Sequence, residues 1–228
     1  QLLPGEPLRI GVDLIADKKS GAFIVIGSSA KLDKISSGGI DLMNCEYSPE
    51  MLGELAKMDG AIIVDEFVTK ILKANVHLNP SDALNTSQTG TRHRTAERTA
   101  EETNLTVITV SEESSLVKVF TDSNTTELEE PSVILGRVNE SLQSVDRMRR
   151  RFDDAVAELG ELEIENSLSN QQVLEVIQRG ELLTRLAIQV RSEALRLGGE
   201  AGLVLIQIDS LESGVKNTLN LVLKDHLP

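Results

Sequence analysis

The chain has 228 residues, of which 40% are hydrophobic, so it can form one large or two modest domains and is not expected to be disordered. Its formal net charge of -13 argues against a protein that wraps a nucleic-acid backbone, unless the basic residues are strongly clustered. Aromatic residues make up only 2% of the chain, so its cores must consist of Leu, Ile and Val, and base stacking on aromatic side chains is not expected.

The first predicted elements are two strands with a helix between them. The apolar run at residues 22–26 lies between glycines, which is typical of a strand buried on both faces, and residues 61–64 show the same pattern. Between them, Pro49 begins a segment whose apolar residues, from Met51 to Met58, recur at helical spacing. The order is therefore strand, helix, strand.

Further strands are expected at residues 68–74 and 105–110, separated by the polar segment 91–102, which has no β character and is expected to be helical. Residues 116–120 are expected to form a hairpin with 105–110. A sheet rich in branched aliphatic residues, with helices between its strands, indicates the α/β class: a layered, mixed central sheet flanked by helices.

The character of the sequence changes after Phe120. Residues 121–126 form a polar, turn-rich run, and the acidic stretch that follows ends in Pro131. We therefore predict a domain boundary at this point, with an α/β domain at residues 1–126 and a second domain at residues 127–228.

The second domain is predicted to be all-α. From Leu135 to Leu159 apolar residues recur in steps of three and four, interrupted by Arg149, which predicts a long helix with a coiled-coil-like seam. A second helix is expected at residues 171–197, stopped by a pair of glycines. The segment from Leu203 contains a strand-like apolar run, but its setting favours helix.

The segment Gly90-Thr91-Arg92-His93-Arg94-Thr95 concentrates polar side chains at the predicted start of a helix. This segment could bind phosphate oxygens, because it offers two guanidinium groups, an imidazole and two hydroxyls. The free N–H groups and the positive dipole end of the helix would add to the binding. The alternative, which the spacing alone favours, is a solvated helix face with a His93 that only fills a polar niche. In that alternative the arginines pair with neighbouring glutamates: Arg92, Arg94 and Arg98 with Glu97, Glu101 and Glu102.

Asp59 and Gly60 directly precede the predicted strand at residues 61–64. At such a sheet edge a ligand can approach, and glycine permits close backbone contact. The carboxylate could hold a hard divalent ion that bridges to phosphates. Asp-Gly is also among the commonest turn pairs, so a simple strand-entry turn is favoured without other information.

Several other kinds of site are excluded. The sequence has no Gly-x-x-x-x-Gly-Lys-Ser/Thr phosphate loop, no Gly-x-Ser-x-Gly elbow, no Gly-x-Gly-x-x-Gly motif and no paired-cysteine metal site. The single cysteine, Cys45, allows no intrachain disulfide, and no apolar run of about 18 residues predicts a membrane span, so the cytosol is the expected compartment. His77 and His226 lack partners at metal-binding spacing. The basic cluster 147–151 could contact nucleic acid, but its acidic neighbours favour ion pairing.

Four segments, in order, resemble the DisA family of diadenylate cyclases. They are Gly38-Gly39-Ile40, Leu55-Ala56-Lys57-Met58-Asp59-Gly60-Ala61, Ala74-Asn75-Val76-His77-Leu78 and the run from Gly90 to Thr99. The helical part after Pro131 is similar to the middle domain of that family. The resemblance covers nearly the whole chain, and it is specific because several motifs agree in order and spacing.

The resemblance implies a nucleotidyltransferase that condenses two ATP molecules into cyclic di-AMP and releases two diphosphates, with Mg or Mn as cofactor. It implies catalytic roles for Asp59, as the metal ligand, and for Arg92, His93 and Arg94. The ATP-binding residues that it implies are Gly60, Ala61, Leu78, Thr91, Arg92, His93, Arg94, Thr95 and, more weakly, Ser111. Because each ATP must attack the α-phosphate of the other, two such domains must face each other.

The resemblance further implies a homo-oligomer, typically an octamer, assembled by the helical domain. In the family a helix-hairpin-helix DNA-binding domain follows, but nothing follows Pro228 here, so we expect DNA binding only through such a missing domain. A recombination or repair protein is an expected regulator, and no membrane association is expected. Two other hypotheses stay open: a sensor that binds ATP or cyclic di-AMP without turnover, and a DNA-repair scaffold with a vestigial site.

Overall fold

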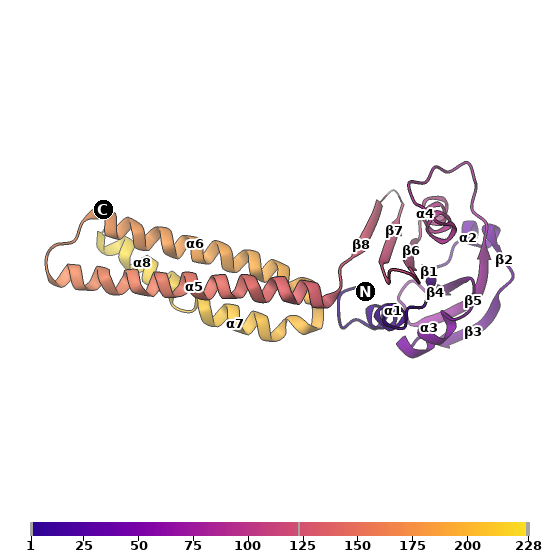
Figure 1. Cartoon of the computed structure of the whole chain (residues 1–228), viewed down its shortest axis with the longest axis horizontal. Helices are drawn as coiled ribbons and strands as arrows, with labels where there is room; N and C mark the ends of the chain where they lie inside the picture. Colours follow the sequence, from indigo (N-terminus) through magenta and orange to yellow (C-terminus); the bar gives the residue numbers. More distant parts are fainter. Residues whose placement is uncertain (1, 123, 227–228) are drawn as a thin grey trace. The chain divides into compact units, whose positions relative to one another are not determined.

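The computed structural model describes residues 2–122 and 124–226, which form two compact units (Figure 1). The first unit contains Glu6–Glu129, and the second contains the described residues from Glu130 onwards together with Leu3–Gly5. Four residues that the predicted domains included lie outside the described residues: Gln1, Ser123, Leu227 and Pro228.

One mixed sheet forms the centre of the first unit (Figure 1). Its described strands are β1 (Ala22–Ile26), β2 (Ser36–Ser37), β3 (Ile40–Glu46), β4 (Ala61–Val64), β5 (Lys70–Leu78), β6 (Thr106–Val110), β7 (Val117–Thr121) and β8 (Asn124–Leu128). Their spatial order is β2-β5-β4-β1-β6-β7-β8, and β3 pairs with β5. Strands β1 and β4 are parallel, whereas the other pairs are antiparallel.

The helices of the first unit are α1 (Pro7–Asp17), α2 (Ala30–Ile35), α3 (Pro49–Leu55) and α4 (Thr91–Thr103). They cover both faces of the sheet, so there is a core on each face. Successive side chains of a strand point to opposite faces and therefore enter different cores. Ile24 of β1 packs in a core with α1 and α3, whereas its neighbours Phe23 and Val25 pack in a core with α2 and α4. The predicted α/β class, with helices flanking a mixed sheet, is confirmed.

The predicted boundary after Thr126 falls inside a strand. Polar residues on both sides of the predicted turn belong instead to the hairpin of β7 and β8, in which Thr121 pairs with Asn124 and Val117 with Leu128. Residues 124–127 are exposed in this strand. Polar side chains suit β8 because it is the last strand of the sheet on this side, and an edge strand need not be apolar on both faces.

Other element boundaries also differ from the sequence prediction. The strand expected at residues 68–74 begins only at Lys70, because Val68 adopts a φ of 57° in the turn before it. The strand then continues to Leu78. The helix that begins at Pro49 ends at Leu55 rather than near Met58. The sequence did not predict five of the described elements: α1, α2, β2, β3 and β8. Most of them are short or lie at an edge of the sheet.

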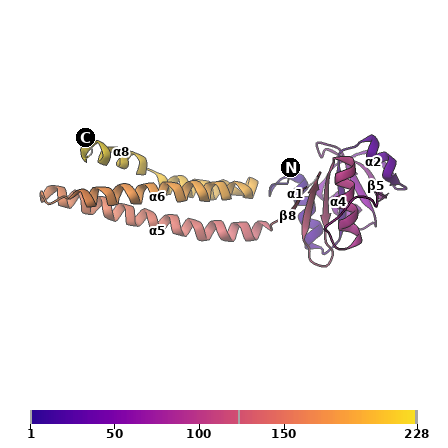
Figure 2. The ribbon, with the colours of Figure 1, turned by 90° about the horizontal axis from the view of Figure 1, so that it is seen from above.

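The second unit consists of α5 (Pro131–Ile164), α6 (Asn170–Ala194), the 3-10 helix η1 (Leu195–Ala201), α7 (Gly202–Glu212) and α8 (Val215–His226). The long helices α5 and α6 lie side by side (Figure 2). The second predicted helix changes to 3-10 form before the glycine pair, where Gly198 has a φ of 55°. Among the described helices, none combines the length and apolar composition that a membrane crossing requires.

The seam predicted for the long helix is present. Val138, Val145, Phe152 and Leu159 recur every seven residues along α5, and all of them are buried in the core of the second unit. Such a repeat keeps one stripe of a helix facing its neighbours over many turns. The predicted all-α unit therefore has a continuous apolar core along α5.

Arg149, which interrupts the apolar pattern, connects α5 to the end of α7. Its guanidinium donates hydrogen bonds to the carbonyl oxygens of Leu211 at 2.8 Å and Ser213 at 2.7 Å, and it pairs with Asp153 at 2.9 Å. A second arginine of the 147–151 cluster pairs with an aspartate of the same helix. The ion-pairing reading of this cluster agrees with the structure.

Candidate functional site

Two hollows lie at one end of the sheet, where the starts of β1 and β4 meet the ends of β5 and β6. The strands meet there because β1 and β4 are parallel, while β5 and β6 run antiparallel beside them. Strand β7 and helix α4 also begin at this end, because Lys118 near the start of β7 and Thr91 at the start of α4 line the hollows.

We call the two hollows the apolar lobe, of about 270 Å³, and the polar lobe, of about 520 Å³. Thr91 and Arg92 line both lobes and lie at their junction. The apolar lobe is further lined by Phe23, Gly60, Ala61, Val76, His77, Leu78 and Thr95. The polar lobe is further lined by Thr89, Gly90, His93, Ser111, Glu112, Glu113, Ser114, Leu116 and Lys118.

The start of α4 presents backbone N–H groups to the polar lobe. Gly90 precedes the helix with a φ of 82°, a conformation that favours glycine, and it supplies no side chain to cap the first turn. The first helical hydrogen bond runs from the Arg94 N–H to the Gly90 carbonyl at 3.2 Å. The N–H groups before Arg94 are therefore available to an anion, which the helix dipole also favours.

Arg92 lies over Gly21, the residue before β1. A β-carbon at position 21 would stand 2.7 Å from the Arg92 Cζ atom, which is closer than real β-carbons approach a neighbour. The missing side chain of Gly21 thus leaves the space that the guanidinium occupies at the junction of the lobes.

His93 packs edge-on against Phe120 of β7, with ring centroids 6.4 Å apart and an interplanar angle of 66°. Burial is the main cause that lowers the pKa of His93, and the nearby cations Lys118 and Arg92 lower it further. The neutral imidazole is therefore favoured at neutral pH, where it can donate one hydrogen bond and accept another.

Gly60 allows β4 to start next to a bulge in β5. A β-carbon at Gly60 would lie 2.8 Å from the carbonyl carbon of Asn75, and the φ of Gly60 is 125°. Asn75 itself has a φ of 56°, at the point where the pairing shifts between Ala61 and Ile63. The bulge changes the course of the backbone at the edge of the apolar lobe, as bulges beside functional sites commonly do.

Asp59 is exposed directly before Gly60 and lines neither lobe. In the part of the chain that the structure describes, no group of three or more His, Cys, Asp or Glu side chains could hold a metal ion. A single carboxylate nevertheless fits Mg²⁺, which commonly takes one or two protein carboxylates and completes its shell with phosphate oxygens and water. The residues present therefore suit a metal that arrives with a polyphosphate.

Three side chains of α4 hold the loop that leads into it. The Glu97 carboxylate accepts hydrogen bonds from Thr86 Oγ1 and, at 3.1 Å, from the Ser87 N–H. Arg98 pairs with Asp82 at 2.5 Å, and Glu102 accepts a hydrogen bond from a backbone N–H of the same loop. The predicted alternative, in which Arg98 pairs with glutamates of its own helix, is wrong, because its guanidinium reaches the preceding loop instead.

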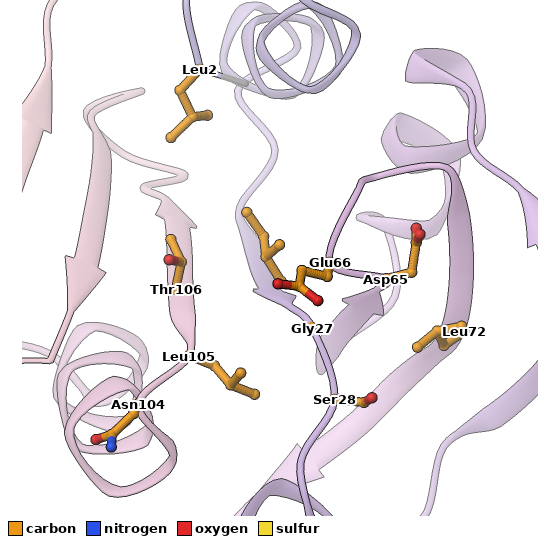
Figure 3. Close-up of a pocket in the computed structure, with 10 residues that line it drawn as sticks. Leu2, Gly27, Ser28, Asp65, Glu66, Leu72, Asn104, Leu105 and Thr106 are labelled. Atoms are coloured by element: carbon orange, nitrogen blue, oxygen red, sulfur yellow. The ribbon is translucent and has the colours of Figure 1, made fainter.

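A third hollow, of about 700 Å³, lies at the opposite end of the sheet, and Figure 3 shows the residues that line it. It is lined by Gly27 directly after β1, by Asp65 and Glu66 in the turn after β4, and by Leu105 before β6, among others. Its described lining contains two carboxylates and no cationic side chain, so it does not suit a phosphate. The first site differs in this respect, because the cationic side chain Arg92 lines both of its lobes.

Models of two protein families match the chain along nearly its whole length. The family described as DisA bacterial checkpoint controller nucleotide-binding matches residues 9–125, and the family described as DisA bacterial checkpoint controller linker region matches residues 128–228. The chain belongs to the DisA family.

Curated members of the DisA family align with this chain from end to end. The DNA integrity scanning protein DisA of Acidothermus cellulolyticus is 39% identical over 227 residues, which cover 100% of this chain and 61% of that protein. The protein of the same name from Kineococcus radiotolerans is 41% identical over 226 residues, which cover 99% of this chain and 63% of that protein. The chain thus spans less than two thirds of the length of these relatives.

Two solved structures show a partial likeness. The crystal structure of a double cysteine mutant of DacA from Staphylococcus aureus is 27% identical, covers 58% of this chain and 91% of that chain, and has a TM-score of 0.47. A hypothetical membrane spanning protein from Bacillus cereus is 22% identical, covers 54% of this chain and 62% of that chain, and also has a TM-score of 0.47.

The structure brings together most of the residues to which the DisA resemblance pointed. Gly60, Ala61, Leu78 and Thr95 line the apolar lobe, His93 and Ser111 line the polar lobe, and Thr91 and Arg92 line both. Asp59 and Arg94 are exposed and line neither lobe. Most of the residues predicted for the site therefore line two adjoining hollows, whereas Asp59 and Arg94 are not among the lining residues.

Sequence reasoning missed several lining residues of this DisA-family site. Phe23 was assigned only to a strand, Val76 was named only within a segment of the family resemblance, and His77 was given no role, although all three line the apolar lobe. Lys118 lines the polar lobe. Its only sequence signal is a cation inside the otherwise apolar run of residues 116–120.

Proposed function

We propose that this chain contains the catalytic and assembly parts of a diadenylate cyclase, which condenses two ATP molecules into cyclic di-AMP and releases two diphosphates. The observation that carries the proposal is the position of Arg92. This residue lines both the apolar lobe and the polar lobe, which also contains Lys118, in a chain of the DisA family. That arrangement suits a ligand with a flat apolar end and a polyphosphate end.

The adenine is assigned to the apolar lobe. Leu78 and Ala61 offer apolar contact there, and both are buried in the fold. Gly60 lets the nucleotide approach the backbone closely because it has no side chain. Thr95 and Thr91 offer hydroxyl groups on the α4 side of the same lobe.

The phosphates are assigned to the polar lobe. The free N–H groups at the start of α4, the Arg92 guanidinium and the Ser111 hydroxyl supply hydrogen-bond donors there. A neutral His93 can donate a further hydrogen bond without adding a third charge beside Arg92 and Lys118. Asp59 would hold Mg or Mn together with the phosphates, and the bound ion would supply charge neutralisation.

The reaction is a nucleotidyl transfer. The ribose 3′-oxygen of one ATP forms a bond to the α-phosphorus of the other, while the bond from that phosphorus to the bridging oxygen breaks. The bridging oxygen keeps the electron pair and leaves as part of diphosphate, and the hydroxyl proton passes to solvent. Arg92 and the N–H groups of α4 stabilise the charge that develops on the phosphate oxygens.

The product requires two nucleotides that face each other, so two copies of the first unit must meet through this site. We propose that the helical unit assembles the copies, in an octamer, and that Arg94, exposed beside the lobes, serves phosphates at that contact. DNA binding, regulation by a repair protein and a cytoplasmic location stay predictions for the whole protein.

An assay of the complete chain with ATP and Mn²⁺ or Mg²⁺ tests the proposal, with the product identified by mass spectrometry. We expect cyclic di-AMP from the wild type and none from Asp59→Asn, whose assembly mass should not change. Full activity of Asp59→Asn would contradict the role of this carboxylate. Binding of ATP without any product would instead favour a nucleotide sensor, and absence of nucleotide binding would favour a scaffold.

A further inference from the structure

Lys118 projects from β7 toward the polar lobe. Its strand neighbours Val117 and Val119 belong to the core on the α1 and α3 side, whereas Phe120 belongs to the core on the α4 side. Since side chains alternate along a strand, Lys118 lies on the same face as Phe120, the residue against which His93 packs. The ammonium group therefore lies on the side of the sheet that carries α4.

The ammonium of Lys118 has a neutral hydrogen-bond partner in the described part of the chain. Its Nζ atom donates a hydrogen bond of 3.0 Å to Oε1 of Gln88, a neutral acceptor. Among the residues that the structure describes, no carboxylate forms an ion pair with it, although Glu112 and Glu113 also line the lobe. Gln88 can thus orient the ammonium without neutralising it.

Three nitrogen-bearing side chains converge on this lobe: Arg92, His93 and Lys118. The two permanent cations disfavour a third charge, which is one cause of the lowered pKa of His93. Like charges held close together in a half-buried pocket are unfavourable unless an anion joins them. The carboxylates Glu112 and Glu113 are exposed to water, whereas Arg92, His93 and Lys118 are half-buried, so the arrangement favours an anionic ligand.

We propose that Lys118 binds the two terminal phosphates of the nucleotide and so holds the diphosphate that leaves. This inference rests on the proposed function. Arg92 lies at the junction with the apolar lobe, so the phosphate next to the ribose lies nearest to it, and the remaining phosphates extend into the polar lobe. When the bridging P–O bond breaks, negative charge grows on the departing diphosphate, and the Lys118 ammonium stabilises it without giving up a proton.

Calorimetry with three nucleotide or phosphate probes tests this inference in the complete chain. We expect Lys118→Met to bind inorganic diphosphate and ATP about tenfold or more weakly than wild type, because a charge-assisted hydrogen bond is lost. AMP, which lacks the terminal phosphates, should bind with unchanged affinity. Lys118→Arg should restore most of the affinity for diphosphate, since it keeps the positive charge.

Lys73→Met is the matched control, because Lys73 is a half-buried lysine of β5 that lines none of the three hollows. It should leave all three affinities unchanged. Equal binding of diphosphate by wild type and Lys118→Met would overturn the inference, as would an equal loss of AMP affinity. Because these readouts measure binding, a chain that makes no cyclic di-AMP but loses diphosphate affinity on Lys118→Met would contradict the proposed reaction and support the role of Lys118.

Discussion

The Arg92 guanidinium occupies the space that a side chain at Gly21 would fill. A β-carbon at Gly21 would stand 2.7 Å from Arg92 Cζ, and the two residues are far apart in the sequence. The contact joins the entry to β1 with the first turn of α4, and it places the guanidinium between the two lobes. A glycine outside every motif therefore helps to position the central cation of the site.

Gly21→Ala should displace the Arg92 guanidinium without unfolding the chain, because the atoms in conflict belong to the far end of a flexible side chain. We expect ATP affinity to fall by about tenfold, the size of one lost charge-assisted hydrogen bond. Titration calorimetry measures this change. Gly53→Ala in α3 is the control, since a β-carbon there meets nothing within 4 Å; equal effects of the two substitutions would contradict the prediction.

Glu97→Ala should release the loop that leads into α4. The carboxylate of Glu97 holds Thr86 and Ser87, and no other side chain replaces those hydrogen bonds in the described part of the loop. We expect faster amide hydrogen exchange at residues 84–90 and several-fold weaker ATP binding, because Thr89 and Gly90 line the polar lobe. The exposed Glu101 on the same helix offers the comparison: Glu101→Ala should leave both exchange and binding unchanged.

The ionisation of His93 should make the stability of the first unit depend on pH. The pKa of His93 in the fold lies below its ordinary value of 6.5, so the unfolded chain binds more protons between the two values. The free energy of unfolding should therefore fall as the pH is lowered through 6.5 toward the lower pKa of the folded state.

Denaturant titrations at several pH values measure this dependence, and NMR of the imidazole measures the pKa directly. His93→Gln should lose this part of the pH dependence, because the substituted amide does not titrate. An imidazole of the wild type that titrates above 6.5 would show that burial and the neighbouring cations do not dominate its surroundings.

Phe152→Ala should destabilise the helical unit strongly. Phe152 is 2% exposed in the seam of α5, and truncation of a buried aromatic residue to alanine costs about 3–5 kcal/mol. Thermal unfolding followed by circular dichroism should show the change as a lower Tm of the helical signal. Leu174→Ala, at a position that is 51% exposed in α6, should change stability by only about 0.5 kcal/mol.

The elements that the sequence determined by itself are those with a local periodic signal. The apolar runs at 22–26 and 61–64 became β1 and β4, and the repeat from Leu135 to Leu159 became the buried stripe of α5. Each signal lies within one element, because the periods of strand and helix place the apolar side chains on the faces that become buried. The motif at 90–95 likewise marked the start of α4.

Only the tertiary structure decided how the parts of the site meet. The parallel register of β1 and β4 places Phe23 and Ala61 at one end of the sheet, and the bulge at Asn75 directs the end of β5 to the same place. Arg98 and its neighbouring glutamates looked like a solvated helix face, but they hold a loop that no pattern connected to them. Contacts of this kind depend on strand order and backbone course.

Lys118 illustrates the same limit. A single lysine in an apolar run has no periodic partner, and its meaning depends on which face of β7 lies toward α4. Side-chain alternation offers two faces, and only the packing of the whole sheet chooses between them. The sequence by itself therefore determined the motifs and the helical seam, whereas the fold decided which distant residues share one pocket.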